Sequence, residues 1–204
     1  MYRKIINKLK DKKIAILGFG REGKSTYKFI RKYLPEKELT ILDINEINIA
    51  DQYINVITGK NYLKNLDVYD FIIKTPGISL KDIKDSNILN KITSQLELLL
   101  EVYKDNVIGI TGTKGKSTTS SLLYEVIKKQ KESVYLLGNI GTPVFDNIEE
   151  YNKDTILVVE MSSHQLEYIK VSPHIAIILN LFEDHLDHAG TLEHYHANKM
   201  NIFK

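Results

Sequence analysis

Apolar runs alternate with longer amphipathic stretches along the first part of the chain. We expect strands over 13–18, 39–43, 55–58 and 71–74, and a helix over 23–33 between the first two strands. Each apolar run has the length of a buried strand and is followed by turn residues. Strands that alternate with helices are typical of a parallel, doubly wound α/β sheet, so the pattern predicts this fold class.

The same pattern restarts after about residue 92. A linking helix is expected over 95–103, and the rest of the chain again alternates between strands and helices. The strands are expected at 107–110, 133–137, 155–160 and 175–180, and the helices at 117–130 and 191–204. We therefore predict two α/β domains, residues 1–92 and residues 93–204.

The expected helix over 117–130 is amphipathic. Its apolar residues Leu122, Leu123, Val126 and Ile127 recur at the spacing of one helical side. We expect these four side chains to share that side.

The last expected helix combines an apolar stripe with a lysine. The stripe contains Leu192, Tyr195, Ile202 and Phe203, and Lys199 falls on the same stripe. A lysine on a buried face either extends its ammonium group to solvent or serves chemistry. The spacing leaves both possibilities open.

Composition and charge limit the function. The 204 residues include 28 Lys and Arg against 26 Asp and Glu, a net charge of +2, and no dense basic cluster, which argues against a nucleic-acid partner. The chain has no cysteine, which excludes disulfides, thiolate zinc sites and cysteine nucleophiles. Residues 1–13 are basic but lack the apolar core of a signal peptide, and no apolar run approaches the roughly 20 residues that span a bilayer. We expect a cytoplasmic protein without membrane contact.

A glycine-rich loop lies between the expected strand at 107–110 and the helix that follows. Its residues are Gly112, Thr113, Lys114, Gly115, Lys116, Ser117 and Thr118. Glycines let backbone N–H groups approach an anion, and a helix N-terminus adds partial positive charge. Lys116 can neutralise phosphate oxygens, and the Ser117 hydroxyl can bind Mg²⁺. The usual P-loop spacing has a glycine where this chain has Ile110, so the loop is a variant, and a coincidental glycine-rich turn is the alternative.

Polar residues follow each strand expected in the second domain. The glycine loop follows the first strand, Asn139 the second, Glu160 the third and Asn180 the fourth. Ligands gather beyond the carboxyl ends of parallel strands, so we expect the site at this edge. Glu160 closes an apolar run, so its carboxylate is expected to be buried and to need a partner. That partner is either a Mg²⁺ ion held by Ser117 or a basic side chain.

The histidines are concentrated in one region, because all six lie between positions 164 and 196. Their spacings do not match the helical pairs of common zinc enzymes, and thiolate ligands are missing. We therefore favour His185 as a single metal ligand beside Glu160 over a zinc centre.

The first domain has a glycine loop of its own. Gly18, Gly20 and Gly23 form the pattern Gly-x-Gly-x-x-Gly after the first strand, and Asp43 stands 20 residues beyond Gly23. The pattern is typical of a backbone approach to a diphosphate, with a carboxylate for a ribose hydroxyl. It does not distinguish NAD from another nucleotide diphosphate, and an ordinary tight turn between strand and helix is the alternative.

Four motifs, in this order, resemble those of the Mur ligases. They are Gly112-Thr-Lys-Gly-Lys-Ser-Thr118, Gly138-Asn-Ile-Gly141, Glu160-Met-Ser-Ser-His-Gln-Leu166, and Glu183-Asp-His-Leu-Asp187 followed by Lys199. With Thr75-Pro76-Gly77-Ile78 after the fourth strand, they are most similar to the branch of the family that adds D-glutamate. The resemblance covers nearly the whole chain. It implies a Rossmann-like domain for a UDP substrate at 1–92 and the N-terminal part of a P-loop-type central ATP-binding domain at 93–204, with the C-terminal amino-acid-binding domain absent.

The resemblance implies an ATP-dependent ligase of peptidoglycan precursor synthesis. Such an enzyme joins D-glutamate to UDP-N-acetylmuramoyl-L-alanine through an acyl phosphate, with ATP and Mg²⁺ as cofactors. Lys116 would hold the ATP phosphates, Ser117 and Glu160 would bind one Mg²⁺, and His185 would help bind a second. Lys199 would react with CO₂ to form a carbamate that supports this second metal.

The resemblance also bears on assembly and activity. A family member is expected to be monomeric. This chain, without a third domain, is expected to bind UDP-type ligands weakly at best and to make no product. An apolar face left exposed on its second sheet would favour self-association.

The substrate contacts are likewise assigned by resemblance. The residues assigned to the UDP substrate are Gly18, Gly20, Arg21, Glu22, Gly23, Asp43, Thr75, Pro76, Gly77, Asn139, Ser163 and Gln165. The loop 18–23 would face the diphosphate, Asp43 would lie near the uridine, and Asn139 would contact the muramoyl-peptide end. Two positions depart from the family pattern: His164 stands where members often have Phe, and Ser94-Gln95 stands where an acidic Gly-Asp pair is usual.

Two other interpretations remain open. One is a sister ligase, such as the lysine- or diaminopimelate-adding Mur enzyme or a folylpolyglutamate synthase, and the Rossmann-like first domain argues against most of these. The other is a nucleotide- or NAD-binding module without ligase chemistry. Binding of UDP-N-acetylmuramoyl-L-alanine or of NAD would distinguish the second interpretation from the D-glutamate ligase.

Overall fold

The computed structural model describes residues 1–184 and 191–204, and the chain divides into two compact units, residues 2–95 and residues 96–204. The sequence placed a boundary at about residue 92, whereas this division falls between Gln95 and Leu96. A short strand at Ile92–Thr93 extends the first sheet, and Gln95 Nε2 donates to Glu22 O and to Thr26 Oγ1. The first unit therefore continues for a few residues past the predicted boundary.

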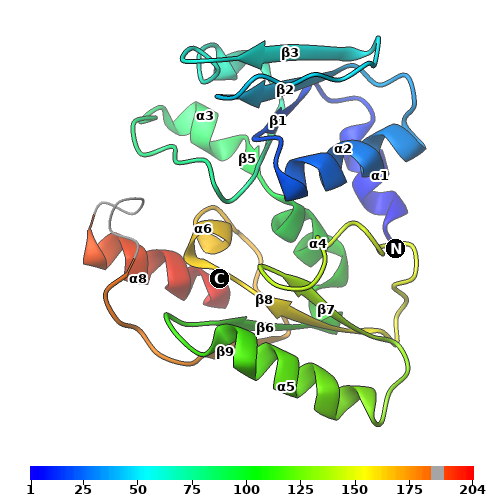
Figure 1. Ribbon diagram of the computed structural model, residues 1–204, viewed down its shortest axis with the longest axis vertical. Coiled ribbons are helices and arrows are strands. Elements are labelled where there is room, and N and C mark those ends of the chain that lie inside the picture. Colours follow the sequence, from blue (N-terminus) through cyan, green and yellow to red (C-terminus); the bar gives the residue numbers. More distant parts are fainter. Residues whose placement is uncertain (185–190) are drawn as a thin grey trace. The chain divides into compact units, whose positions relative to one another are not determined.

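The N-terminal unit is a five-stranded parallel sheet in the order β3-β2-β1-β4-β5 (Figure 1). Its strands are β1 (Ile14–Leu17), β2 (Leu39–Asp43), β3 (Ile54–Thr58), β4 (Phe71–Lys74) and β5 (Ile92–Thr93). Its helices are α1 (Arg3–Leu9), α2 (Arg21–Tyr33), α3 (Ser86–Asn90) and the 3-10 turn η1 (Leu66–Val68). All four strand pairs are parallel, which confirms the predicted α/β fold class for this unit.

The strand order reverses between β1 and β4. The chain leaves β1 through α2 toward β2 on one side, and it leaves β4 toward β5 on the other. Adjacent strands whose connections diverge leave a crevice at their carboxyl ends, where ligands of open α/β sheets bind. The loop after Leu17 and the segment after Lys74 follow these two paired strands at this end of the sheet.

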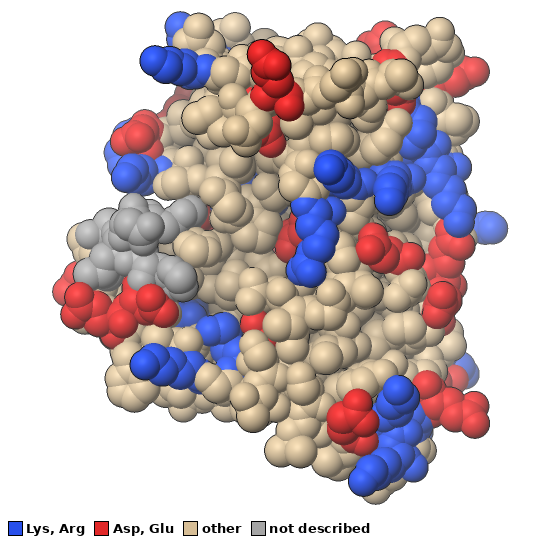
Figure 2. Space-filling model, viewed as in Figure 1, with Lys and Arg blue, Asp and Glu red and all other residues tan. Residues whose placement is uncertain are grey.

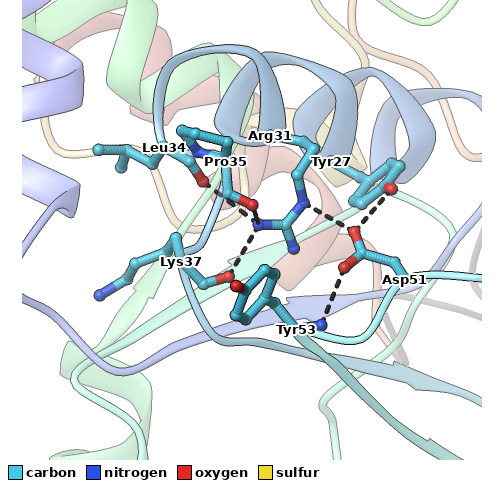
Figure 3. A network of polar contacts seen from close by, with 7 residues as sticks. All are labelled: Tyr27, Arg31, Leu34, Pro35, Lys37, Asp51 and Tyr53. Atoms are coloured by element: carbon cyan, nitrogen blue, oxygen red, sulfur yellow. Dashed lines mark hydrogen bonds and ion pairs between the residues drawn. The ribbon is translucent and has the colours of Figure 1, made fainter.

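In the N-terminal unit, a polar network connects α2 to the turn that follows it and to the segment before β3 (Figure 3). Arg31 Nε donates to Asp51 Oδ2 at 2.7 Å, and Tyr27 OH donates to the same oxygen at 2.9 Å. The backbone N–H of Tyr53 donates to Asp51 Oδ1. Arg31 Nη1 also donates to three main-chain carbonyls, those of Leu34, Pro35 and Lys37. One guanidinium therefore ties the end of α2 both to the turn that follows it and to the segment before β3.

The C-terminal unit holds a four-stranded parallel sheet in the order β7-β8-β6-β9 (Figure 1). Its strands are β6 (Val107–Thr111), β7 (Val134–Gly138), β8 (Ile156–Glu160) and β9 (Ile175–Ile178). Its helices are α4 (Gln95–Tyr103, continuing from the first unit), α5 (Lys116–Lys128), α6 (Ser163–Leu166) and α8 (Leu192–Met200), with 3-10 turns η2 (Lys104–Asn106) and η3 (Asn201–Phe203). The predicted strands and the linking helix are all present, within one or two residues at most of their ends.

Helix α5 covers one face of this sheet, and α6 and α8 lie on the opposite face (Figure 1). Leu123, Tyr124 and Ile127 pack against the sheet core at Ile110 and Val158. The prediction that Leu122 and Val126 share the apolar side of α5 with Leu123 and Ile127 was wrong. Leu122 and Val126 are 64% and 51% exposed. A helix that lies on a sheet buries a narrow stripe, and here that stripe runs through Ser120 and its neighbours three, four and seven residues later.

The buried stripe of α8 contains the predicted lysine. Tyr195, Lys199 and Ile202 are each at most 1% exposed, whereas Phe203, predicted on the same stripe, is 54% exposed. The Lys199 side chain therefore does not extend to solvent.

Charges of both signs are interspersed on the face drawn in Figure 2, as the near-neutral composition leads one to expect. Within the described residues, no helix is long and apolar enough to cross a membrane.

Candidate functional site

The glycine loop joins β6 to α5 in a conformation that only glycines adopt readily. Gly112 has φ +152° and Gly115 has φ +83°. Gly115 is the N-cap of α5, and no described side chain caps this helix. The helices α6 and α8, by contrast, are capped by the side chains of Ser162 and Thr191. The first backbone N–H groups of α5 are therefore left open to an anion.

Two lysines meet at this loop. Lys116 Nζ donates to Gly112 O and to Thr113 O, both at 2.9 Å. Lys199 Nζ, from α8, also donates to Gly112 O at 2.9 Å, and it lies 4.8 Å from the ring centre of Tyr195. The structure thus brings together two of the three residues predicted to be catalytic, Lys116 and Lys199.

The environment of Lys199 lowers the pKa of its amine from 10.5 to about 8. Burial is the main cause, the charge of Lys116 adds to it, and Asp184 opposes it. A neutral amine is the nucleophilic form of lysine, so this position favours chemistry at Nζ more than an ordinary surface lysine does.

Glu160 ends β8 next to the loop. In register it lies beside Ile110 of β6 on one side and Gly138 of β7 on the other, and it is 1% exposed. Asn139 Nδ2 donates to Glu160 Oε1 at 2.7 Å. The second oxygen, Oε2, is buried and accepts no hydrogen bond from any residue in the ranges 1–184 and 191–204. A buried carboxylate oxygen without a donor is costly unless something else fills the position.

A hard divalent cation fits this unpartnered oxygen. Carboxylate and hydroxyl oxygens are the ligands that Mg²⁺ prefers, and Ser117 stands exposed in the first turn of α5. Within the described part of the chain, no three His, Cys, Asp or Glu side chains group closely enough to hold a metal by themselves. His185, predicted as a metal ligand, lies outside the described residues.

The loop residues differ in exposure. Thr113 is 6% exposed, whereas Lys114, Gly115, Ser117 and Thr118 are exposed at the surface. The exposed positions are those that an anion at the α5 N-terminus would meet.

Ser163 and Gln165, predicted as substrate contacts, are buried in the C-terminal unit at 3% and 6% exposure. The Gln165 side-chain oxygen accepts from Ser162 N at 3.0 Å, and Gln165 N donates to Ser162 Oγ at 3.2 Å. This reciprocal pair is a capping box at the start of α6. It gives Gln165 a structural role, and the substrate contact stays a prediction.

The glycine loop of the N-terminal unit is tightly packed against the segment after β4. Gly18 has φ +89°, and a Cβ there would lie 2.1 Å from Thr75 Oγ1. A Cβ on Gly23 would lie 2.0 Å from Gly18 O. Thr75 Oγ1 donates to Leu17 O at 3.1 Å. The glycines are therefore needed for packing around Thr75, which is followed by the half-buried Pro76 and the exposed Gly77.

Asp43 supports this loop from within. It is 7% exposed, its Oδ2 accepts from Phe19 N at 2.7 Å, and its Oδ1 accepts from Asn45 N at 2.9 Å. Both oxygens thus have backbone partners, and a contact with uridine stays a prediction. Gly20 is the N-cap of α2 and makes no side-chain cap hydrogen bond, and the helix that begins with Arg21 and Glu22 directs the positive end of its dipole toward this loop.

Sequence reasoning missed two side chains that hold the glycine loop between β6 and α5. Asn180 accepts from the N–H groups of Thr113 and Lys114, and Tyr195 OH donates to Thr113 Oγ1 at 3.2 Å. Asn180 was recognised only as the end of a strand, and Tyr195 only as part of an apolar stripe. Two signals could have indicated them. Asn180 lies at the strand edge where the site was expected, and Tyr195 lies on the same helix face as Lys199.

The chain is similar to known ligases along most of its length. Residues 110–204 match the family model described as the Mur ligase middle domain. The chain is 38% identical over 205 residues to the UDP-N-acetylmuramoylalanine--D-glutamate ligase of Clostridium botulinum (strain Kyoto / Type A2), and 33% identical over 207 residues to that of Clostridium kluyveri. Each alignment covers 96% of this chain and 45% of the relative, so the chain spans a little under half the length of these curated relatives.

A solved structure shares the fold. It is the UDP-N-acetylmuramate:L-alanyl-gamma-D-glutamyl-meso-diaminopimelate ligase from Neisseria meningitides, at a TM-score of 0.50 and 19% identity, with 94% of this chain and 67% of that chain covered. At this identity the likeness speaks for the fold alone. The middle-domain match contains the glycine loop, Glu160 and Lys199, and the alignments to the curated ligases cover 96% of this chain, so both units are similar in sequence to Mur ligases.

Proposed function

We propose that this chain is the part of an ATP-dependent ligase that binds ATP and the UDP substrate, and that the whole enzyme adds D-glutamate to UDP-N-acetylmuramoyl-L-alanine in peptidoglycan precursor synthesis. The observation that carries the proposal is the N-terminus of α5, which has no described side-chain cap and where Lys116 follows Gly115. Beside it, β8 ends in Glu160, whose Oε2 has no hydrogen-bond partner among the described residues. The substrate pair is that of the D-glutamate ligases of Clostridium botulinum and Clostridium kluyveri, to which the chain is similar.

The residues of the C-terminal unit have distinct proposed roles. The open N–H groups of α5 and the Lys116 ammonium group would bind the β- and γ-phosphates of ATP, after Lys116 leaves its bonds to the loop carbonyls. Ser117 and Glu160 would hold Mg²⁺, which when bound offsets phosphate charge. His185 and Lys199, the latter as a carbamate, would support a second Mg²⁺ near the reacting carboxylate. The low pKa of Lys199 supports this role, because CO₂ reacts with a neutral amine.

The N-terminal unit would bind the UDP moiety. The positive end of the α2 dipole, after the glycine N-cap Gly20, suits a diphosphate, and ligands of open α/β sheets bind beyond the carboxyl ends of strands such as β1 and β4, where the strand order reverses. Arg21 and Glu22 begin that helix, and Thr75, Pro76 and Gly77 follow β4. Asn139, Ser163 and Gln165 are retained as proposed contacts to the muramoyl-peptide end. A cytoplasmic, monomeric enzyme is proposed on the same grounds of family.

Ligand binding by the chain tests the proposal directly. Calorimetric titration with a non-hydrolysable ATP analogue and Mg²⁺ should show binding, and Lys116→Ala should weaken it about tenfold or more, because the phosphates lose their cation. Lys129→Ala, which removes one exposed charge near the other end of α5, is the matched control and should leave binding unchanged. Equal binding by Lys116→Ala and wild type would contradict the proposal.

The second half of the experiment identifies the other substrate. UDP-N-acetylmuramoyl-L-alanine should bind, weakly, and NAD should not. Binding of NAD alone would support a nucleotide-binding module instead. We expect no D-glutamate-dependent ATP turnover by this chain, so measurable turnover would overturn that expectation. Amine specificity separates the D-glutamate ligase from its sister enzymes. It is measured in a protein of the relatives' full length, which includes the part that does not align with this chain.

A further inference from the structure

We propose that Asn180 is a positioning residue of the ATP-site loop, a role that rests on the proposed nucleotide site. Its carboxamide fixes the loop at Thr113 and Lys114, so that the N–H groups from Gly115 onward face the phosphates. Asn180 follows β9, on the opposite side of β6 from Glu160.

The contacts of Asn180 use both ends of its carboxamide. Oδ1 accepts from Thr113 N at 3.1 Å and from Lys114 N at 2.9 Å, and Nδ2 donates to Lys114 O at 3.0 Å. The main-chain oxygen of Asn180 also accepts from Thr113 N at 3.0 Å. One side chain therefore satisfies a donor and an acceptor of the same residue, Lys114, which requires an amide.

A second anchor holds the same loop. Thr113 Oγ1 accepts from Phe182 N at 2.9 Å and from Tyr195 OH at 3.2 Å, and it donates to Phe182 O at 3.2 Å. Gly112 lies so close to this segment that a Cβ on it would be 3.1 Å from Leu179 Cβ. The first half of the loop is thus bound to residues 179–182 and to α8 without any contribution from a ligand.

Because protein contacts hold the first half of the loop, the loop can be ordered before the nucleotide binds. The N–H groups of Thr113 and Lys114 have protein partners, whereas α5, which begins at Lys116 after its N-cap Gly115, has no described side-chain cap. A loop that is already held loses less conformational entropy when it binds an anion. An aspartate at position 180 would keep the acceptor but lose the donor to Lys114 O, and it would place a negative charge beside the phosphates.

Two substitutions and a control separate positioning from general stability. Asn180→Ala removes the carboxamide. Asn180→Asp keeps an acceptor for the two N–H groups. Asn106→Ala is the matched control, because Asn106 Nδ2 donates to the main-chain oxygens of Asn152, Lys153 and Thr155 and so supports the fold away from the loop. All four proteins are compared at a temperature at which circular dichroism shows each of them folded.

The first measurement is hydrogen exchange of the Lys114 backbone amide by NMR, without nucleotide. Exchange should be about tenfold faster in Asn180→Ala and near the wild-type rate in Asn180→Asp and Asn106→Ala. The second is titration with a non-hydrolysable ATP analogue and Mg²⁺. The dissociation constant should rise about tenfold in Asn180→Ala, at least as much in Asn180→Asp, and not in Asn106→Ala.

The outcomes separate the two proposals. Absence of nucleotide binding by the wild type would refute the proposed function, and the exchange rates would still decide whether Asn180 holds the loop. Wild-type binding together with unchanged Lys114 exchange and unchanged affinity in Asn180→Ala would overturn the positioning role while the proposed function stands. Equal losses in Asn106→Ala would also overturn it, because they would show a structural effect only.

Discussion

Lys116 and Lys199 place their ammonium nitrogens 2.9 Å from the same atom, the carbonyl oxygen of Gly112. Two like charges that share one acceptor repel each other, and this repulsion is one cause of the lowered pKa of Lys199. Lys116, which we propose binds phosphate, is folded back onto its own loop, where it also donates to Thr113 O. A phosphate that draws Lys116 away would relieve the crowding at Gly112.

Replacing Lys199 by methionine should change how stability depends on pH. Below pH 8 the folded and unfolded forms of the wild type both carry the proton on Lys199. Between about 8 and 10.5 only the unfolded form holds it, so wild-type stability should rise relative to Lys199→Met, by up to about 1.4 kcal/mol per pH unit. Urea unfolding of both proteins at pH 7.0, 8.5 and 9.5, in CO₂-free buffer, measures this difference. A constant difference across the range would show that the pKa of Lys199 is not lowered.

Replacing Glu160 by glutamine should remove the effect of Mg²⁺ and leave the metal-free protein at least as stable as the wild type. The carboxylate oxygen Oε2 is buried without a partner among the described residues, so its charge costs stability until a cation binds. Melting temperatures with an ATP analogue, with and without Mg²⁺, should differ for the wild type and coincide for Glu160→Gln. Glu132→Gln, at an exposed position of the same unit, is the control and should respond like the wild type. If the melting temperature of Glu160→Gln rises with Mg²⁺ as much as that of the wild type, Glu160 is not a ligand of the metal.

The sequence was sufficient to predict those features that depend on local pattern. The apolar runs that became β1, β6 and β8 each fill a strand buried between neighbours, and their composition admits few alternatives. The glycine loops were recognisable because positive φ angles and close approaches exclude other residues. By contrast, β5 has only two residues, too few for a periodic signal.

Features that depend on tertiary contacts could not be predicted. Asp43 fits a dinucleotide pattern by position, yet its oxygens bond to Phe19 N and Asn45 N, because the tight loop itself has amides to satisfy. Gln165 lies in a motif associated with the substrate and closes a capping box. Asn180 contacts residues more than 60 positions away, and no spacing rule connects the two.

The two glycines at the start of α2 should tolerate alanine very differently. In Gly23→Ala the new methyl group would meet Gly18 O at 2.0 Å, a contact that requires the backbone to move, and we expect a loss of about 2 kcal/mol or more. Gly20 has no described heavy atom within 4 Å of its Cβ position, so Gly20→Ala should cost less than about 1 kcal/mol. Urea unfolding followed by circular dichroism measures both. Equal costs would mean that the loop is looser than its packing around Thr75 indicates.

Replacing Asp51 by asparagine should weaken the N-terminal unit at neutral pH, and this loss should disappear in acid. Burial tends to raise the pKa of Asp51, but the Tyr53 N–H, the Tyr27 hydroxyl and the Arg31 guanidinium outweigh it and hold the pKa below 3.8. The carboxylate therefore contributes stability above pH 3.8 and loses it as the pH falls through the lowered pKa.

We expect Asp51→Asn to cost about 2 kcal/mol at pH 7, since a charge-assisted pair with Arg31 is lost and the side chain of Asp51 is only 9% exposed. The control is Asp11→Asn, whose pair with Lys10 is 3.8 Å long between largely exposed side chains and should be worth almost nothing. Urea unfolding from pH 7 to pH 2.5 should show the Asp51→Asn curve approaching the wild type as acid protonates Asp51. A gap that stays constant down to the lowest pH would mean that the cost comes from altered packing around Tyr27 and Tyr53, and that the charge of Asp51 contributes nothing to the network.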